Sequence, residues 1–185
     1  TLSRSSAASD VYKRQLMLNV TARQELMRTI VETLGVVVEE ARLDFGEDGL
    51  SVRVVDPSHV AMIKMDVDSA AFETWEVDET KLGLEMRKMH QFLSVAGAGD
   101  MVELAYNDES GQATIHIGRI DLNLRPLDNS TLNPPNVPSL ELPCGVTIGG
   151  SELAQALRAA KLVGDLVNLS LTEDTFTVNV KGSTD

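Results

Sequence analysis

The chain has 185 residues, of which 43% are apolar and 24% charged, and 28 Asp and Glu residues against 16 Lys and Arg give a net charge of −12. This composition excludes a collagen-like fibre and a disordered chain, and no run of about 18 apolar residues is present to cross a membrane. The single cysteine, Cys144, cannot form an internal disulfide, so we expect a cytoplasmic protein.

The first fifteen residues are Ser-rich and basic and differ in character from the acidic, periodic sequence that follows. We expect 1–15 to be a non-native or disordered leader and leave it out of the fold. The next segment predicts a helix, because Leu26, Ile30 and Leu34 recur on one helical face. Thr21 is its expected N-cap.

Strand and turn signals follow this helix. The turn Gly46-Glu47-Asp48-Gly49 between alternating apolar runs predicts a β-hairpin. Further strands are expected at 60–68, 72–77, 101–106, 112–117 and 120–126, and a second helix at 85–96. Residues 16–126 therefore predict an α+β domain, rich in strands, with two helices on one side.

Four of the six prolines of the chain lie between Leu132 and Cys144, which makes 127–143 an extended connector. An internal repeat then becomes visible, because the segment from Val167 matches the segment from Ala41 at an offset of 126 residues. The repeat predicts a second strand-helix-strand-turn-strand unit over 144–185. Its first strand is expected at Val146-Thr147. Its helix is expected to be capped by Ser151, after a turn at Gly149-Gly150, with one residue of slip against the first copy. This copy holds about a third of the period, so we expect a second domain that is cut short.

Enzymatic and metal-binding alternatives find weaker support in the sequence. Asp56 and His59 could form an acid/base pair beside a proline turn, but no nucleophile with an orienting partner accompanies them. A calcium loop starting at Asp44 fails, because Gly46 and Val55 occupy ligand positions. We expect no catalytic residue, no metal and no cofactor.

Several motifs together make 16–185 resemble the DNA polymerase sliding clamps of the proliferating-cell nuclear antigen family, of the archaeal type. They are ARLDFGEDGLSVRVVDPSHVAMIKMDV at 41–67, LSVAGAGD at 93–100, the connector with Val137-Pro138, and SELAQALRAAKLVGD at 151–165. The resemblance implies a DNA clamp fold with two similar domains, each with two helices on one face, the second domain being incomplete here. It also implies a processivity factor for replication and repair that, at full length, encircles duplex DNA as a homotrimer. Its location would be the nucleoid of a prokaryote or a eukaryotic nucleus.

The same resemblance implies two sets of functional residues. Basic residues of the helices would face DNA, namely Arg23, Arg28, Arg87, Lys88, Arg158 and Lys161. A hydrophobic pocket at the connector would bind peptide tails of polymerase, clamp loader, ligase and nuclease, lined by Val55, His59, Val60, Leu132, Val137 and Pro138. Two alternatives stay open: an acidic adaptor domain that binds peptides and never encloses DNA, and a checkpoint-type clamp subunit.

Overall fold

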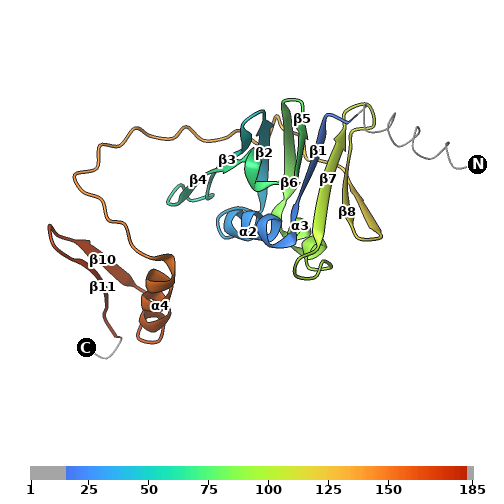
Figure 1. Cartoon of the computed structure of the whole chain (residues 1–185). Helices are drawn as coiled ribbons and strands as arrows, with labels where there is room; N and C mark the ends of the chain where they lie inside the picture. Colours follow the sequence, from blue (N-terminus) through green and yellow to red (C-terminus); the bar gives the residue numbers. More distant parts are fainter. Residues whose placement is uncertain (1–15, 183–185) are drawn as a thin grey trace, which may run out of the picture. The chain divides into compact units, whose positions relative to one another are not determined.

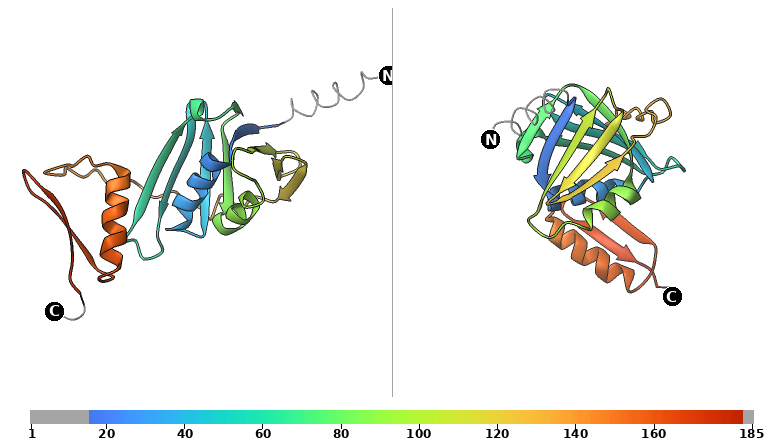
Figure 2. Two further views of the ribbon diagram at one scale, coloured as in Figure 1. Left: turned by 60° about the horizontal axis from the view of Figure 1, so that its bottom comes forward. Right: turned by 90° about the vertical axis from the view of Figure 1, so that its right-hand side faces the viewer.

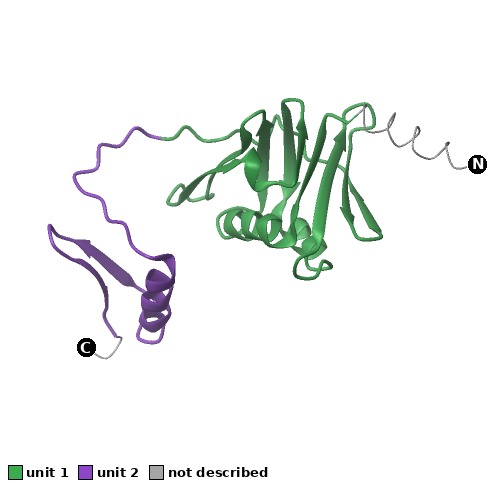
Figure 3. Cartoon of the chain, viewed as in Figure 1, with its two compact units in different colours: residues 1–137 green, residues 138–185 purple. Residues whose placement is uncertain are grey.

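The computed structural model describes residues 16–182, so the leader expected at 1–15 lies outside the described residues. The chain divides into two compact units that meet between Val137 and Pro138, coloured green and purple in Figure 3. None of the helices within 16–182 combines the length and the apolar character needed to cross a lipid bilayer.

The first unit contains two antiparallel sheets and two helices that lie next to each other (Figure 1, Figure 2). Its elements are, in chain order, β1 (Leu18–Arg23), α2 (Gln24–Gly35), β2 (Glu40–Gly46), β3 (Gly49–Val55), β4 (Met62–Asp68), the 3-10 turn η1 (Ser69–Ala71), β5 (Thr74–Val77), β6 (Thr80–Glu85), α3 (Met86–Leu93), β7 (Met101–Asn107), β8 (Gln112–Ile117) and β9 (Ile120–Leu124). One sheet has the strand order β5-β1-β7-β8-β9 and the other the order β4-β3-β2-β6.

Both helices bury one face in a core that they share with the two sheets. The apolar stripe predicted for the first helix is confirmed, because Ile30, Val31 and Leu34 of α2 are buried. On α3 the buried residues are Met86, Met89 and Leu93. Each such side chain contributes about 1.5–3 kcal/mol of transfer free energy. The opposite faces of α2 and α3 keep their charged residues in solvent.

The predicted strands and the predicted hairpin are found in the structure. Strands β7, β8 and β9 lie within one residue or two of the expected ranges, and β2 and β3 meet at the turn pair Gly46 and Gly49. Gly49 has a φ of 148°, and a Cβ atom placed on it would lie 2.1 Å from the carbonyl oxygen of Val67. A side chain at residue 49 is therefore excluded both by the positive φ and by the close contact with Val67.

The N-caps expected at Thr21 and Ser151 are wrong. Thr21 pairs with Thr74 on one side and with Glu103 on the other, so β1 continues to Arg23 and α2 begins only at Gln24. In the second unit the helix begins at Gly150 and its N-cap is Gly149, so Ser151 lies inside the first turn. Neither observed N-cap, Arg23 or Gly149, makes a side-chain capping bond.

The strand β6 is absent from the sequence prediction. It pairs with β2, where Leu82 lies opposite Leu43, and it ends at Glu85, directly before α3. Its apolar residues Leu82 and Leu84 flank Gly83, a residue that weakens a strand signal. The helix expected over 85–96 is real but shorter than predicted.

The second unit repeats the first half of the first unit. It contains α4 (Gly150–Lys161), β10 (Val167–Leu171) and β11 (Phe176–Val180). Both ends of α4 lie 126 residues after the ends of α2, and the hairpin registers agree at the same offset. Leu169 faces Val178 as Leu43 faces Val52. The repeat is confirmed, and the one-residue slip expected between the helices is not present.

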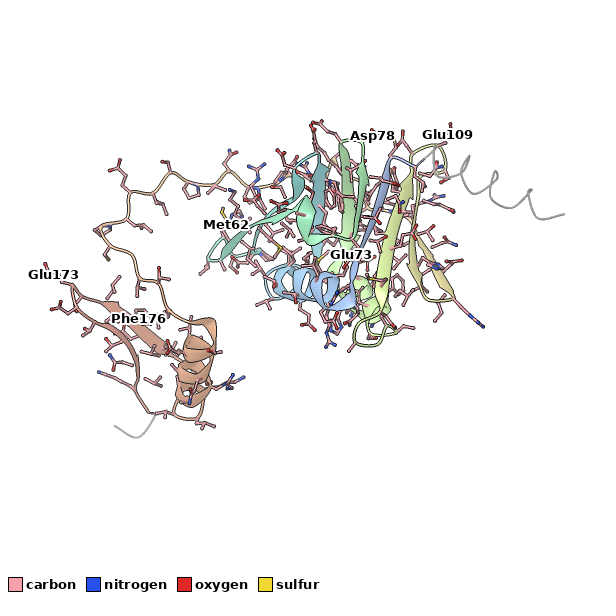
Figure 4. The ribbon with its side chains drawn as sticks, viewed as in Figure 1. Met62, Glu73, Asp78, Glu109, Glu173 and Phe176 are labelled. Atoms are coloured by element: carbon pink, nitrogen blue, oxygen red, sulfur yellow. The ribbon has the colours of Figure 1, made fainter. Side chains whose placement is uncertain are left out.

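The second unit covers its apolar residues less completely than the first. Leu43 is 5% exposed, whereas its counterpart Leu169 is 55% exposed. Phe176, labelled in Figure 4, is half-buried. The strand expected at Val146-Thr147 is wrong, because these two residues lie in no strand and pair with no strand of the described chain. The elements that pair with β1 in the first unit have no counterpart among the described residues of the second.

Candidate functional site

The helices carry charge of the opposite sign to the rest of the chain. Within α2, α3 and α4 there are five arginine and lysine residues against three glutamates, a net charge of +2, although the whole chain carries −12. Local charge of this kind decides where an anionic partner can approach an acidic protein.

Arg28 on α2 is held by the carboxylate one turn further along the helix. Its Nε donates to Glu32 Oε1 at 2.7 Å, and His90 Nε2 on α3 lies 3.2 Å from the same oxygen. The Arg28 guanidinium, followed by the His90 hydrogen bond, holds the pKa of Glu32 below its usual value. Glu32 therefore remains anionic at neutral pH and offsets the charge of Arg28.

Three of the six basic residues expected to face DNA are engaged in ion pairs. Besides Arg28, Lys88 pairs with Glu85 and Arg23 Nε lies 3.5 Å from Glu73 Oε1, a residue labelled in Figure 4. Arg23 ends β1 and does not lie on a helix, contrary to the expectation.

The other three basic residues make no ion pair with any residue of 16–182. Arg87 is exposed on α3, where it borders a hollow of about 520 Å³ together with Val36 and His90. In the second unit, Arg158 and Lys161 are exposed in the last turns of α4, a position that favours cations. Of the six residues expected to face DNA, these three can therefore pair with an anionic partner without first breaking an ion pair.

The loop between β3 and β4 is organised by one carboxylate. Asp56 Oδ1 accepts hydrogen bonds from the backbone N–H groups of Val60 and Ala61, both at 2.6 Å, and Oδ2 accepts one from Ser58 N–H at 3.0 Å. The Ala61 N–H, with those of Val60 and Ser58, holds the pKa of Asp56 below its usual value. His59 at the top of the loop has a φ of 56°.

This arrangement argues against the acid/base pair considered for Asp56 and His59. The carboxylate is committed to three backbone donors, and its lowered pKa makes it a weaker general base while leaving it no proton to donate as an acid near neutral pH. Asp at the first position of such a loop is a known turn signal, which could have predicted the structural role. The loop instead holds Val60, which is 86% exposed, out into solvent.

The structure brings together only some of the residues expected to form the connector pocket. A cavity of about 160 Å³ lies between the outer side of β2 and β3 and the start of the connector, lined by Val55 and Leu132 together with Arg42, Arg53 and residues 133–135. His59 and Val60 lie outside it, on the loop that follows β3. Val137 is 46% exposed at the end of the first unit, and Pro138 is exposed at the start of the second.

Arg42 and Arg53 are cavity residues that the sequence prediction did not include. Arg42 is mostly buried and makes a bidentate contact with Asp44, at 2.7 and 2.9 Å. Both arginines alternate with the apolar residues of β2 and β3, which places them on the outer face of the sheet. The alternation of polar and apolar residues along the two strands could have predicted that Arg42 and Arg53 lie on this face.

Comparison with known proteins gives a consistent result. Residues 17–121 match the family model described as "Proliferating cell nuclear antigen, N-terminal domain". The DNA polymerase sliding clamps of Methanosarcina barkeri and Methanococcoides burtonii are each 34% identical over 170 residues, which is 91% of this chain and 69% of each relative.

Solved structures agree with the sequence relatives. The structure titled "C-terminal region of FEN-1 bound to A. fulgidus PCNA" superimposes with a TM-score of 0.86 at 30% identity, over 91% of this chain and 69% of that one. The antigen from Thermococcus kodakaraensis, at 20% identity and a TM-score of 0.72, shares the fold.

Proposed function

Because the chain belongs to the proliferating cell nuclear antigen family, whose archaeal members are DNA polymerase sliding clamps, we propose that it encircles duplex DNA as part of a ring and tethers replication and repair enzymes. A ring around DNA cannot dissociate sideways, so it raises the local concentration of a tethered enzyme without sequence-specific contacts. Tethering requires no chemistry of the clamp itself, and we assign no catalytic residue.

The observation that carries this proposal is the charge of the helices. A body with a net charge of −12 repels phosphates, but α2, α3 and α4 together carry +2. Arg87, Arg158 and Lys161 are exposed and make no ion pair among residues 16–182. Helices that face the hole of a ring would therefore be the part of the chain most compatible with duplex DNA.

Ring closure is proposed to use the open edge of the first sheet. Strand β9 is the last strand of the order β5-β1-β7-β8-β9, so its outer edge has no partner strand among residues 16–137. An open edge is a template for pairing with a strand from another chain. We assign three copies to the ring, as the family resemblance implies.

Partner tails are proposed to bind along the connector. A tail of the FEN-1 nuclease is the bound partner in the A. fulgidus structure, which is 30% identical to this chain. In this chain Val60 and Val137 offer exposed apolar surface, and Val55 and Leu132 line the cavity beneath the connector. An apolar side chain of the tail in such a pocket, with backbone pairing along the connector, is a known recognition mode.

The test is the mass in solution of the protein expressed from its full reading frame, with and without a synthetic peptide of the FEN-1 C-terminal region. We expect a species of three times the chain mass that binds the peptide, and loss of binding in Val137→Asp. Val36→Asp is the matched control, because Val36 is 85% exposed and does not line the cavity at the start of the connector. A monomer that binds no peptide would favour the adaptor alternative.

A further inference from the structure

The beginning of the connector is bound to the edge of β6. The backbone N–H of Leu127 donates to the carbonyl oxygen of Gly83 at 2.8 Å, and the two residues form an isolated antiparallel bridge. Asn129 Nδ2 donates to the carbonyl oxygen of Lys81 at 2.7 Å, two residues earlier on the same strand. Both of these β6 carbonyls are acceptors that an edge strand would otherwise leave open.

The docked segment is also compact in itself. Asp128 Oδ1 accepts from the backbone N–H of Ser130 at 2.8 Å, and the Asp128 carbonyl accepts from the Thr131 hydroxyl at 2.8 Å. The Leu132 N–H donates to the carbonyl of Asn129 at 3.3 Å. Residues 127–132 thus form a folded turn on β6, which we call the connector anchor.

The chain changes character directly after the connector anchor. Apart from one contact of Asn133 with Ser130, no hydrogen bond is recorded for the described residues 133–148. They contain no helix or strand before α4. The position of residue 132 therefore decides where the extended stretch with Val137 begins.

The connector anchor fits because residue 83 has no side chain. A Cβ atom placed on Gly83 would lie 2.7 Å from Leu132 Cδ1 and 3.0 Å from both Cβ and the carbonyl oxygen of Leu127. The Leu132 methyl group can rotate away, but the Leu127 carbonyl is backbone and can yield only if the bridge to β6 shifts. Gly83 is buried, and its φ is outside the range that favours glycine. The requirement at this position is thus for space and not for backbone freedom.

We propose that Gly83 is a positioning residue for partner binding: by leaving room for Leu127 and Leu132 on β6, it holds the connector anchor in place and sets the start of the stretch that receives partner tails. The inference rests on the proposed tethering function, which it extends to a residue remote from the connector in sequence. An ordered anchor lowers the conformational entropy that a tail must remove on binding.

Gly83→Ala tests the proposal, with Gly35→Ala as the matched control. A Cβ atom on Gly35 meets Met86 Cβ at 3.6 Å, an ordinary contact, so that variant leaves the connector undisturbed. In Gly83→Ala we expect the Leu127 amide to exchange with deuterium at least tenfold faster and the FEN-1 tail peptide to bind about tenfold more weakly. Thermal unfolding of the unit, followed by Trp75 fluorescence, reports whether the fold is retained.

A second variant keeps the test decisive if Gly83→Ala does not fold. Asn129→Ala removes the bond to Lys81 without touching the core, and we expect the same two effects at smaller size. Unchanged amide exchange in a folded Gly83→Ala would overturn the anchor, and faster exchange with unchanged peptide affinity would overturn its positioning role. If the unaltered protein binds no peptide, the proposed function is wrong, and the exchange data still decide whether Gly83 holds the anchor.

Discussion

Replacing Leu43 and Leu169 by alanine, one at a time, tests the energetic difference between the two copies of the repeat. The two leucines occupy the same position of the same hairpin, facing Val52 and Val178. They differ in their surroundings, because Leu43 is 5% exposed and Leu169 is 55% exposed. The two substitutions therefore differ in the burial of the leucine, while the residue type and the strand register are the same.

The expected magnitudes follow from burial. Removing a buried leucine side chain and leaving a cavity costs about 2–5 kcal/mol, and we expect about 3 kcal/mol for Leu43→Ala. Leu169 already has more than half of its surface in water and leaves no closed cavity, so Leu169→Ala removes about 1 kcal/mol or less of transfer free energy.

Trp75 makes the measurement specific for the first unit. It is the only tryptophan of the chain, its indole N–H donates to the Gly46 carbonyl at 3.0 Å, and its ring lies 4.5 Å from that of Phe72. In urea unfolding of the 185-residue chain followed by Trp75 fluorescence, Leu43→Ala shifts the midpoint by about 1.5 M if the slope is about 2 kcal/mol per M. Leu169→Ala leaves this transition in place.

A shift of the Trp75 transition by Leu169→Ala as large as that by Leu43→Ala would refute the reasoning. It would mean that the second unit unfolds together with the first, so that the two cannot be treated as separate compact units. Measurement at several protein concentrations excludes association of the exposed apolar residues as the cause of a shift.

Three further outcomes follow from the charges. Glu32→Gln releases Arg28, so we expect the assembled clamp to bind duplex DNA about threefold more tightly at low salt, with a steeper salt dependence in a titration. The pKa of Asp56 is lowered, so its stabilisation of the loop is present above the unfolded pKa of about 3.9 and is lost as pH falls through the lower folded value. The protection factors of the loop amides, corrected for the intrinsic pH dependence of exchange, therefore stay constant from pH 7 to 5. Asp121 Oδ1 accepts a hydrogen bond from His116 Nδ1 at 2.5 Å, which raises the pKa of His116, and Glu103 on β7 faces the same ring. This stabilisation is full below about pH 6.5 and is lost as pH rises through the folded pKa. An NMR titration of the imidazole would show it, as would protection factors of the β9 amides corrected for the intrinsic pH dependence of exchange.

Matched variants separate these effects from general changes in charge. Glu47→Gln, in the exposed β2–β3 turn, changes net charge as Glu32→Gln does and is expected to leave DNA binding unchanged. Asp56→Asn keeps one acceptor oxygen for Val60 and Ala61 but presents an NH₂ group to Ser58 N–H, so only the Ser58 amide is expected to lose most of its protection. A His116 pKa that is unchanged in Asp121→Asn would contradict the assigned cause of its shift.

The sequence predicted the elements whose signal is local. Helix α2 shows its apolar stripe at helical spacing, and the β2–β3 hairpin shows alternation around a glycine turn, so both are found as expected. The internal repeat also predicted the second hairpin correctly, because matching the two copies at one offset combines the weak strand pattern of each copy. Such features depend on residues near one another in the chain.

The failures concern features that depend on distant residues. Thr21 has the composition of a helix cap, but pairing with Thr74 and Glu103 keeps it in a strand. The strand β6 is recognised only through its pairing with β2, and Gly83 is explained only by Leu127 and Leu132, more than forty residues away. Tertiary contacts decide these positions against local propensity.

For the candidate site, too, local features could be predicted from the sequence and features that depend on distant residues could not. Basic residues of a helix face can be predicted from spacing, but whether each is free depends on a neighbour in the folded state. Arg28 and Lys88 have carboxylates within one helical turn, which spacing can reveal. The contact of His90 with Glu32 joins two helices and could not be foreseen from either one.

The distribution of charge supports the proposed ring, which would retain DNA without strong contacts to it. At physiological ionic strength charges act over about 8 Å, so a phosphate near α2 or α3 responds to those helices and only weakly to acidic strands further away. The pairing of Arg28 with Glu32, and of Lys88 with Glu85, limits the attraction at the helix face itself. Strong contacts would add affinity but would also resist movement along the duplex, whereas a ring needs no such contacts to remain on it. Partial neutralisation of the helix face therefore fits the proposed function. In it, the closed ring would retain the DNA, and the basic residues of the helices would only offset the repulsion between the acidic chain and the phosphates.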